Sequence, residues 1–158
     1  MLGESQEKSI AIIFNDKNEL LVDQLVSYGE NDWNFSGGGI EKGETEEQGL
    51  LRELQEELGT NKFEIVFKSK NLVTYNWPWK VTVQRIFKKH ELYFGQSQRQ
   101  FIVKFVGKKS DIKPDPSEIR KIEWIKRDEF NNYLRFSNQV KVTEDVLKEY
   151  NTKLWQIH

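Results

Sequence analysis

The stretch from Gly38 to Gly59, which reads GGIEKGETEEQGLLRELQEELG, contains the most strongly specified element of the chain. Thr45 and Gln48 stand three residues apart and can form a capping box, in which each side chain accepts a hydrogen bond from the other residue's backbone amide. Gly59 can take the left-handed conformation that ends many helices. The spacing therefore predicts a helix from Thr45 to Leu58.

The two sides of this predicted helix differ in chemistry. At 100° per residue, one stripe is apolar and is expected to face the core, with Leu50 at its edge and Leu51, Leu54 and Leu58 along it. The opposite stripe carries three carboxylates, Glu53, Glu56 and Glu57. Like charges at this spacing destabilise a helix by roughly 0.2–0.5 kcal/mol per pair. A solvated acidic face is one interpretation, and a bound divalent cation such as Mg²⁺, which prefers hard oxygen ligands, is the other.

The spacing of fixed residue types favours the cation. Gly38 is followed after five residues by Glu44 and after seven more by the run Arg52-Glu53-Leu54-Gln55-Glu56-Glu57-Leu58-Gly59. This pattern resembles the Nudix box of the Nudix hydrolases. Only Thr60, where that family usually has an aliphatic residue, departs from it.

The resemblance implies roles for the residues of the box. Glu53, Glu56 and Glu57 are the expected Mg²⁺ ligands, with Mn²⁺ as a possible substitute and the backbone carbonyl of Gly38 as a further ligand. Arg52 and Glu44 are expected to form an ion pair that braces the loop against the helix and orients the ligands. An ordinary surface arginine is the alternative for Arg52.

Composition limits the other classes of function. The chain has 158 residues, of which 37% are hydrophobic, so we expect one domain over residues 1–158, with residues 1–7 loose. The net charge of −1 argues against binding to duplex DNA. The absence of cysteine and the presence of only two histidines argue against thiol chemistry and zinc sites. No long apolar run or leader is present, so we expect a cytoplasmic protein that does not enter membranes; its oligomeric state is left open.

Apolar runs outside the box predict strands and two later helices. The expected strands are 8–14, 19–25, 63–68, 72–75, 81–87, 99–106 and 122–125, and the expected helices are 127–134 and 142–155. Strands around one central helix, followed by terminal helices, predict an α/β fold with a mixed sheet between helices. The Nudix resemblance implies the same α/β/α sandwich.

Further segments resemble one subgroup, the bacterial RNA pyrophosphohydrolases and the related diadenosine tetraphosphate hydrolases. These are the stretch from Trp33 through Ile40 and the run Phe94-Gly95-Gln96-Ser97-Gln98-Arg99-Gln100-Phe101. Ser36 and Gly37 depart from the subgroup, which has proline and glutamine at these two places. The resemblance covers about residues 8–150 and is strongest at the box.

The subgroup resemblance also implies groups that contact substrate. Glu118 lies in a late loop where a glutamate of the subgroup can act as general base, although a helix glutamate such as Glu56 is an alternative. The glycine run permits close backbone approach to metal or phosphate. Candidate substrate-binding residues are Gly37, Gly39, Tyr75, Lys8, Arg99 and Lys141, and Trp77 and Trp79 either stack on a base or pack against the sheet.

The resulting hypothesis is a Mg²⁺-dependent Nudix pyrophosphohydrolase that cleaves a phosphoanhydride bond of a nucleotide polyphosphate. The expected substrates are a dinucleoside polyphosphate or the 5′-triphosphate end of RNA. One alternative is a housecleaning hydrolase of free nucleoside triphosphates or nucleoside diphosphate derivatives. The other is a non-catalytic nucleotide sensor, which the complete set of charged box residues disfavours.

Overall fold

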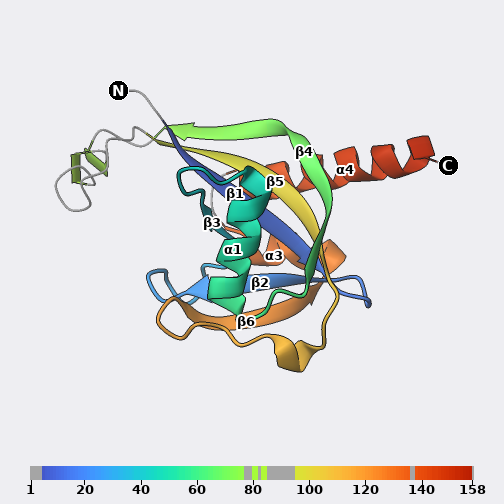
Figure 1. The fold of residues 1–158 in the computed structure, drawn as a ribbon, viewed down its shortest axis with the longest axis horizontal. Helices are drawn as coiled ribbons and strands as arrows, with labels where there is room; N and C mark the ends of the chain where they lie inside the picture. The colour runs from blue at the N-terminus through green and yellow to red at the C-terminus, as the bar shows by residue number, and fades with distance from the viewer. Residues whose placement is uncertain (1–4, 77–79, 82, 85–94, 136–137, 158) are drawn as a thin grey trace.

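A mixed six-stranded sheet is the central feature of the computed structural model, which describes residues 5–76, 80–81, 83–84, 95–135 and 138–157 (Figure 1). Its strands are β1 (Ser5–Phe14), β2 (Glu19–Leu25), β3 (Ser36–Gly39), β4 (Phe63–Asn76), β5 (Gly95–Phe105) and β6 (Ile119–Lys126). The main order is β4-β5-β1-β2-β6. Only the pairing of β1 with β5 is parallel, so the sheet is mixed.

Strand β3 lies between β1 and β2, which separate from each other beyond the turn that joins them. β1 and β2 form a hairpin that pairs Phe14 with Leu20. β3 then pairs antiparallel with the first part of β1, from Lys8 opposite Gly39 to Ala11 opposite Ser36. An isolated bridge between Asp23 and Asn34 ties β2 to the residues that precede β3. The glycine run is therefore held by β1, and the residues just before it are held by β2.

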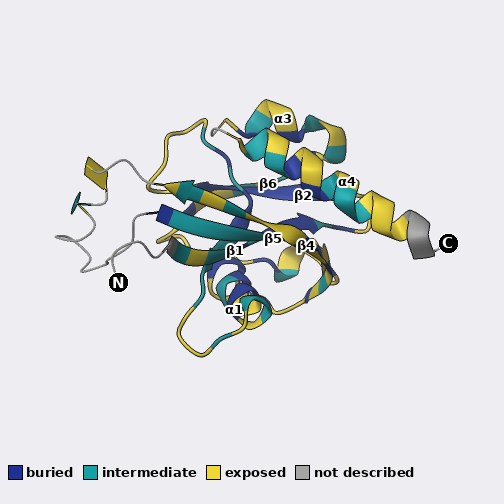
Figure 2. Cartoon of the chain, turned by 90° about the horizontal axis from the view of Figure 1, so that it is seen from above, coloured by how far each residue is buried: buried dark blue, intermediate teal, exposed yellow. Residues whose placement is uncertain are grey.

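Helices cover both faces of the sheet, as Figure 2 shows. Helix α1 (Glu46–Leu58) lies on one face, and α3 (Phe130–Tyr133) and α4 (Gln139–Ile157) lie on the other. Each face has its own apolar core, one around Leu54 and Phe101 and the other around Ile12 and Ile102. The predicted α/β/α sandwich with a mixed sheet is confirmed.

Several predicted elements differ from the structure. The strand predicted over 81–87 is wrong where the structure describes it, because Lys80, Val81, Val83 and Gln84 are helical. Trp77 and Trp79 lie outside the described residues. The strands predicted over 63–68 and 72–75 are one strand, β4, whose pairing with β5 is interrupted by two irregularities. The helix predicted over 127–134 is a 3₁₀ turn, Arg127–Glu129, followed by the single turn of α3.

The buried side of α1 also differs from the prediction. Leu50 is fully buried, whereas Leu51 is 39% exposed, and Glu57 is buried although the prediction placed it on the polar stripe. The inward arc is centred on Leu50, Leu54 and Glu57 because these residues fall within one narrow sector at 100° per residue. One carboxylate of the box therefore points into the protein.

Helix α4 packs through the predicted face. Val146 is buried, and Val142, Leu147 and Tyr150 pack against the same core. The ring of Tyr150 meets that of Phe67 edge to face, with centroids 5.4 Å apart. Leu154, at the end of the predicted face, is exposed. Within the described part of the chain, no helix is long and apolar enough to cross a membrane.

Candidate functional site

Helix α1 begins and ends as its sequence predicts. The capping box between Thr45 and Gln48 is present, and Gly59 has a positive φ of 71°. A Cβ atom at Gly59 would lie 2.6 Å from the carbonyl oxygen of Lys113. Glycine is therefore required there both for its conformation and for the close approach of a later loop.

That later loop is attached to the last turn of α1. The backbone amides of Lys113 and Asp115 donate to the carbonyl oxygens of Leu58 and Glu57, both at 2.8 Å. The amide of Glu118 then donates to the carbonyl of Asp115, and its carbonyl accepts from the amide of Val26 at 2.9 Å. The carbonyls of the last helical turn have no partner within the helix, so they accept these bonds from the loop. The bonds hold the loop that carries Glu118 beside the acidic side of the helix.

The glycine run approaches its neighbours too closely for side chains. A Cβ at Gly37, whose φ is 156°, would lie 2.2 Å from the carbonyl oxygen of Ser9 in β1. A Cβ at Gly38 would lie 2.5 Å from a carboxylate oxygen of Glu53. The backbone of β3 therefore lies directly against the Glu53 carboxylate.

Arg52 joins the loop to the acidic side of α1. Its Nε donates to Glu44 Oε2 at 2.8 Å, so the predicted ion pair is present. One Nη atom donates to the carbonyl oxygen of Gly39 at 2.9 Å, and the other lies 3.1 Å from Glu53 Oε1 and 3.2 Å from Glu56 Oε2. The hydrogen bonds from Arg52 lower the pKa of Glu44, and those to Glu44 raise the pKa of Arg52.

The carboxylates of α1 lie in different environments. Burial raises the pKa of Glu57, which is 8% exposed, to about 9, and the nearby charges of Asp23, Glu53 and Glu118 add to the effect. Burial also raises the pKa of Glu53. Glu56 is 59% exposed at its side chain. The site thus brings together carboxyl groups whose ionisation is unfavourable without a compensating cation.

A divalent cation fits these residues. Among the described residues no three acidic or histidine side chains lie close enough together to hold a metal ion as they are placed, and Arg52 binds the carboxylates of Glu53 and Glu56, which would have to turn towards a cation. The donors are hard oxygens, the Gly38 backbone lies against Glu53, and the pKa of Glu57 is raised by burial beside other carboxylates. This donor set suits Mg²⁺ or Mn²⁺ rather than a soft metal.

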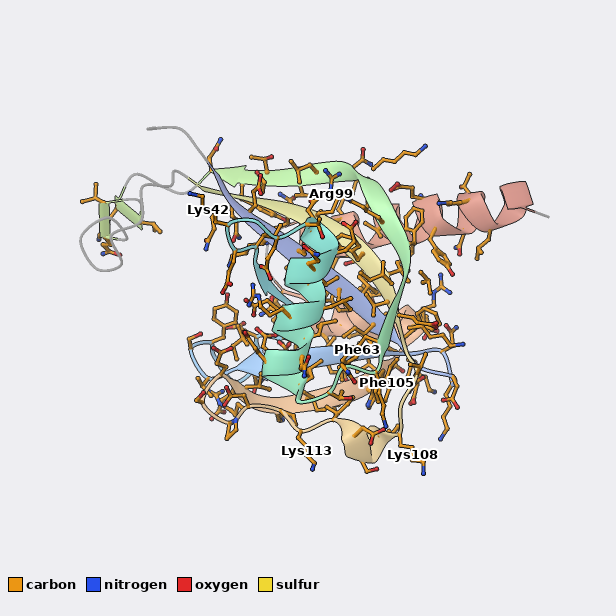
Figure 3. The ribbon with its side chains drawn as sticks, in the orientation of Figure 1. Lys42, Phe63, Arg99, Phe105, Lys108 and Lys113 are labelled. Carbon is orange, nitrogen blue, oxygen red and sulfur yellow. The ribbon has the colours of Figure 1, made fainter. Side chains whose placement is uncertain are left out.

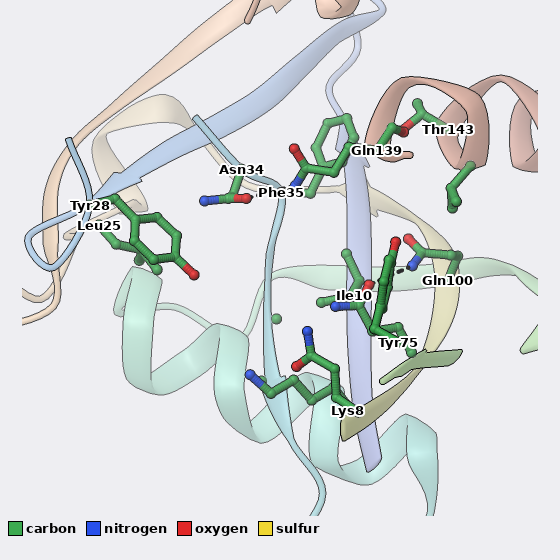
Figure 4. Close-up of a pocket in the computed structure, with 15 residues that line it drawn as sticks. Lys8, Ile10, Leu25, Tyr28, Asn34, Phe35, Tyr75, Gln100, Gln139 and Thr143 are labelled. Atoms are coloured by element: carbon green, nitrogen blue, oxygen red, sulfur yellow. Dashed lines mark hydrogen bonds between the residues drawn. The ribbon is translucent and has the colours of Figure 1, made fainter. Parts of the chain in front are cut away.

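A cavity of about 140 Å³ adjoins the glycine run (Figure 4). Of the predicted substrate-binding residues, Lys8, Tyr75 and Gly37 line it. Tyr28 and Tyr75 lie on opposite sides of it in Figure 4. The cavity therefore offers two aromatic rings and an ammonium group next to the acidic site.

Two amide side chains in the lining of this cavity were not predicted. Gln139 Nε2, at the start of α4, donates to Asn34 Oδ1 at 2.7 Å. The remaining amide atoms, Asn34 Nδ2 and Gln139 Oε1, are buried without a partner. The pair thus retains one donor and one acceptor. Only the juxtaposition of α4 with the segment before β3 reveals it, so no local sequence signal could have indicated this pair.

Other predicted substrate-binding residues lie away from the cavity lining. Arg99 donates to Glu46 at 3.1 Å and to the carbonyls of Ser69 and Lys70, near the start of α1 (Figure 3). Lys141 is 73% exposed and pairs with Asp145 at 3.0 Å. The Gly39 carbonyl is taken by Arg52. Their proposed contacts with phosphate stay predictions.

The family model for the NUDIX domain matches residues 6–146 of the chain. An RNA pyrophosphohydrolase of Orientia tsutsugamushi (strain Boryong) is 32% identical over 142 residues, covering 88% of this chain and 85% of that protein. An RNA pyrophosphohydrolase of a Nitratiruptor species is 41% identical over 102 residues, covering 64% of this chain and 56% of that protein.

Solved structures give the same fold. The E. coli dihydroneopterin triphosphate pyrophosphohydrolase superposes with a TM-score of 0.69 at 14% identity, covering 92% of this chain and 97% of that one. A C. elegans Ap4A hydrolase superposes with a TM-score of 0.63 at 16% identity, covering 94% and 98%. Nudix enzymes generally use a divalent metal such as Mg²⁺. With every charged residue of the box present and its α/β/α sandwich, the chain belongs to the Nudix family and is a hydrolase of phosphoanhydride bonds.

Proposed function

We propose that this Nudix hydrolase is a Mg²⁺-dependent pyrophosphohydrolase that acts on the 5′-triphosphate end of RNA. The observation that carries the proposal is that Gly38, whose backbone lies against Glu53, also lines a cavity with two tyrosines, a lysine and an amide pair. An anionic polyphosphate and the nucleoside attached to it need these two environments side by side. The names of the relatives at 32–41% identity support the choice of RNA.

Glu53, Glu56, Glu57 and the carbonyl of Gly38 would hold the cation. When bound, Mg²⁺ neutralises charge on the phosphates and polarises the bond to be cleaved. Arg52 would keep the carboxylates in place, since it contacts Glu44, Glu53 and Glu56 at 2.8–3.2 Å. Binding of the cation would require Glu53 and Glu56 to shift part of their hydrogen bonding away from Arg52.

Glu118 is the proposed proton acceptor. It is exposed to solvent, yet its charge contributes to the raised pKa values of Glu53 and Glu57, so it lies close to both. Water would attack a phosphorus atom, the bridging P–O bond would break, and one proton of the water would pass to the Glu118 carboxylate. The leaving phosphate or pyrophosphate would take the electron pair of that bond.

The cavity is the proposed place of the nucleoside next to the cleaved phosphates. Tyr28 and Tyr75 could contact the base or ribose, and base–aromatic stacking is worth roughly 1–3 kcal/mol. Lys8 would contact a phosphate oxygen. The free donor and acceptor of Asn34 and Gln139 match the edge of a nucleobase, which presents both kinds of group.

Comparative hydrolysis tests this proposal. Rates of phosphate or nucleotide release are measured for 5′-triphosphorylated RNA, diadenosine tetraphosphate, free nucleoside triphosphates and a nucleoside diphosphate sugar, with Glu56→Gln as the inactive control. The highest kcat/KM is expected on RNA. A higher value on diadenosine tetraphosphate, on free triphosphates or on the sugar nucleotide would replace the RNA assignment. Binding without turnover on any of these substrates would favour the sensor.

A further inference from the structure

Asp23 is a buried carboxylate beneath the acidic site. It lies within β2, its residue is 1% exposed, and its Oδ2 accepts a hydrogen bond from Ser36 Oγ at 2.7 Å. Its other oxygen, Oδ1, is buried without a partner. Among the described residues no basic side chain forms a salt bridge with it. A neutral amide could accept the bond from Ser36 equally well, so the charge itself lacks a partner in the fold.

The position of Asp23 directs this charge towards α1. Side chains alternate along a strand, so Asp23 shares its face of β2 with Leu21, which belongs to the core beneath α1. Among the neighbouring charges, that of Asp23 has the largest effect in raising the pKa of Glu57. Geometry supports this placement, because Asp23 binds Ser36, two residues before Gly38, whose backbone lies against the Glu53 carboxylate.

Ser36 links Asp23 to the backbone that lies against the helix carboxylates. Ser36 is the first residue of β3 and is buried, and two residues later the backbone of Gly38 lies directly against the Glu53 carboxylate. The backbone of Asp23 also exchanges two hydrogen bonds with Asn34, at 2.8 and 2.9 Å. Asp23, Ser36 and the glycine run thus form a continuous set of contacts that ends at the acidic side of α1.

We propose that Asp23 is a positioning residue of the cation site, whose negative charge strengthens divalent-cation binding at the carboxylates of α1 and whose bond to Ser36 holds the glycine run in place. The proposal rests on the cation site of the proposed function, but not on the identity of the substrate. Ser36 stands where similar enzymes have proline, so the bond to Asp23 supplies a restraint that the proline ring would otherwise give. A bound cation would in turn supply the partner that Asp23 lacks.

Cation binding without substrate tests the proposal. Mn²⁺ affinity is measured by electron paramagnetic resonance for the wild type, Asp23→Asn, Ser36→Ala and the exposed control Asp145→Asn. Asp23→Asn keeps an acceptor for Ser36 and removes only the charge. It is expected to bind Mn²⁺ about tenfold more weakly, as is typical when a group behind the ligands is changed, whereas Asp145→Asn is expected to match the wild type. Ser36→Ala, which keeps the charge, is expected to lose less affinity than Asp23→Asn.

Two further measurements separate this role from a merely structural one. In chelator, the melting temperature of Asp23→Asn is expected to equal or exceed that of the wild type, because an unpaired buried charge has been removed. The Mg²⁺ concentration for half-maximal activity is expected to rise about tenfold, with kcat recovering at saturating Mg²⁺. Unchanged Mn²⁺ affinity, with or without a lower melting temperature, would overturn the proposal.

A second variant protects the test against misfolding. The double variant Asp23→Ala/Ser36→Ala removes both partners of the buried hydrogen bond together, a change that proteins tolerate better than the loss of one partner. It must show the same weakening of Mn²⁺ binding. If the wild type binds Mn²⁺ but does not cleave RNA, the substrate assignment fails while the role of Asp23 stands; if the wild type does not bind Mn²⁺, both fail.

Discussion

Replacing Glu57 by Gln is expected to stabilise the metal-free protein at alkaline pH while abolishing hydrolysis. Burial raises the pKa of Glu57 from its ordinary value near 4.5 to about 9. A carboxyl group whose pKa is raised on folding contributes stability that is present below pH 4.5 and is lost as the pH rises towards 9. Glutamine keeps the volume of the side chain and cannot ionise, so the variant escapes this loss.

The size of the effect follows from the shift in pKa. One pKa unit corresponds to about 1.4 kcal/mol. At pH 8, well above the ordinary pKa of 4.5, keeping Glu57 protonated in the fold therefore lowers the free energy of unfolding by at most about 5 kcal/mol. At pH 8, below its pKa of about 9, Glu57 is mostly protonated in the folded protein, and the amide oxygen of the variant can accept the same hydrogen bonds. The expected gain is therefore at most about 5 kcal/mol, or roughly 10–20 °C in melting temperature for a chain of this length.

Thermal denaturation in chelator between pH 5 and pH 8 measures this gain. The difference between Glu57→Gln and the wild type is expected to be near zero at pH 5 and to grow steadily towards pH 8. Glu56→Gln is the matched control, because Glu56 is exposed and lies on the same helix. A Glu57→Gln protein that melts at or below the wild-type temperature at pH 8 would refute the reasoning that Glu57 is a buried, uncompensated carboxyl group.

Three other substitutions test separate parts of the site. Glu118→Gln is expected to lower kcat by about 10²–10⁴-fold with little change in KM; steady-state kinetics giving a wild-type kcat would leave Glu118 as a solvated loop residue. Gly37→Ala is expected to destabilise the fold by about 1–3 kcal/mol, because the new Cβ would lie 2.2 Å from the Ser9 carbonyl oxygen; an unchanged urea midpoint would contradict this geometry. Lys8→Met is expected to raise KM for triphosphorylated RNA about tenfold, with the exposed control Lys148→Met unchanged, and an equal effect of both variants would place Lys8 outside the site.

The parts of the fold that were predicted correctly depend on local signals. The capping box at Thr45 and Gln48 and the terminal Gly59 act within one or two turns, so the limits of α1 could be read from neighbouring residues. The spacing of Glu44 and Arg52 likewise predicted an ion pair that the structure contains. Such features need no knowledge of the sheet.

The errors arise where distant segments meet. The predicted inward stripe of α1 runs along Leu51, Leu54 and Leu58 with Leu50 at its edge. In the structure Leu50 is fully buried and Leu51 is exposed, because the sheet beneath a helix sets its docking angle. The alternating residues from Val81 were mistaken for a strand, although the described part of that segment is helical. Tertiary packing overrode the local pattern in both cases.

The unpredicted residues of the candidate site have the same origin. Asn34 and Gln139 are 105 positions apart in the chain and meet only because α4 lies over the segment before β3. Asp23 did have a sequence signal, a charge directly after the apolar run Leu20-Leu21-Val22, but its partner Ser36 could be identified only from the bridge that places Asp23 beside Asn34, just before β3. Local patterns thus indicated the helix carboxylates, whereas their surroundings required the fold.

The most direct measurement is a single-turnover reaction of the wild type and Glu57→Gln with 5′-triphosphorylated RNA, each in Mg²⁺ and in chelator, followed by release of phosphate and pyrophosphate. A Mg²⁺-dependent conversion of the RNA to a 5′-monophosphate end is expected for the wild type only. Conversion at the same rate in chelator, or by Glu57→Gln in Mg²⁺, would contradict the central claim that the carboxylates of α1 hold the cation that this hydrolysis needs.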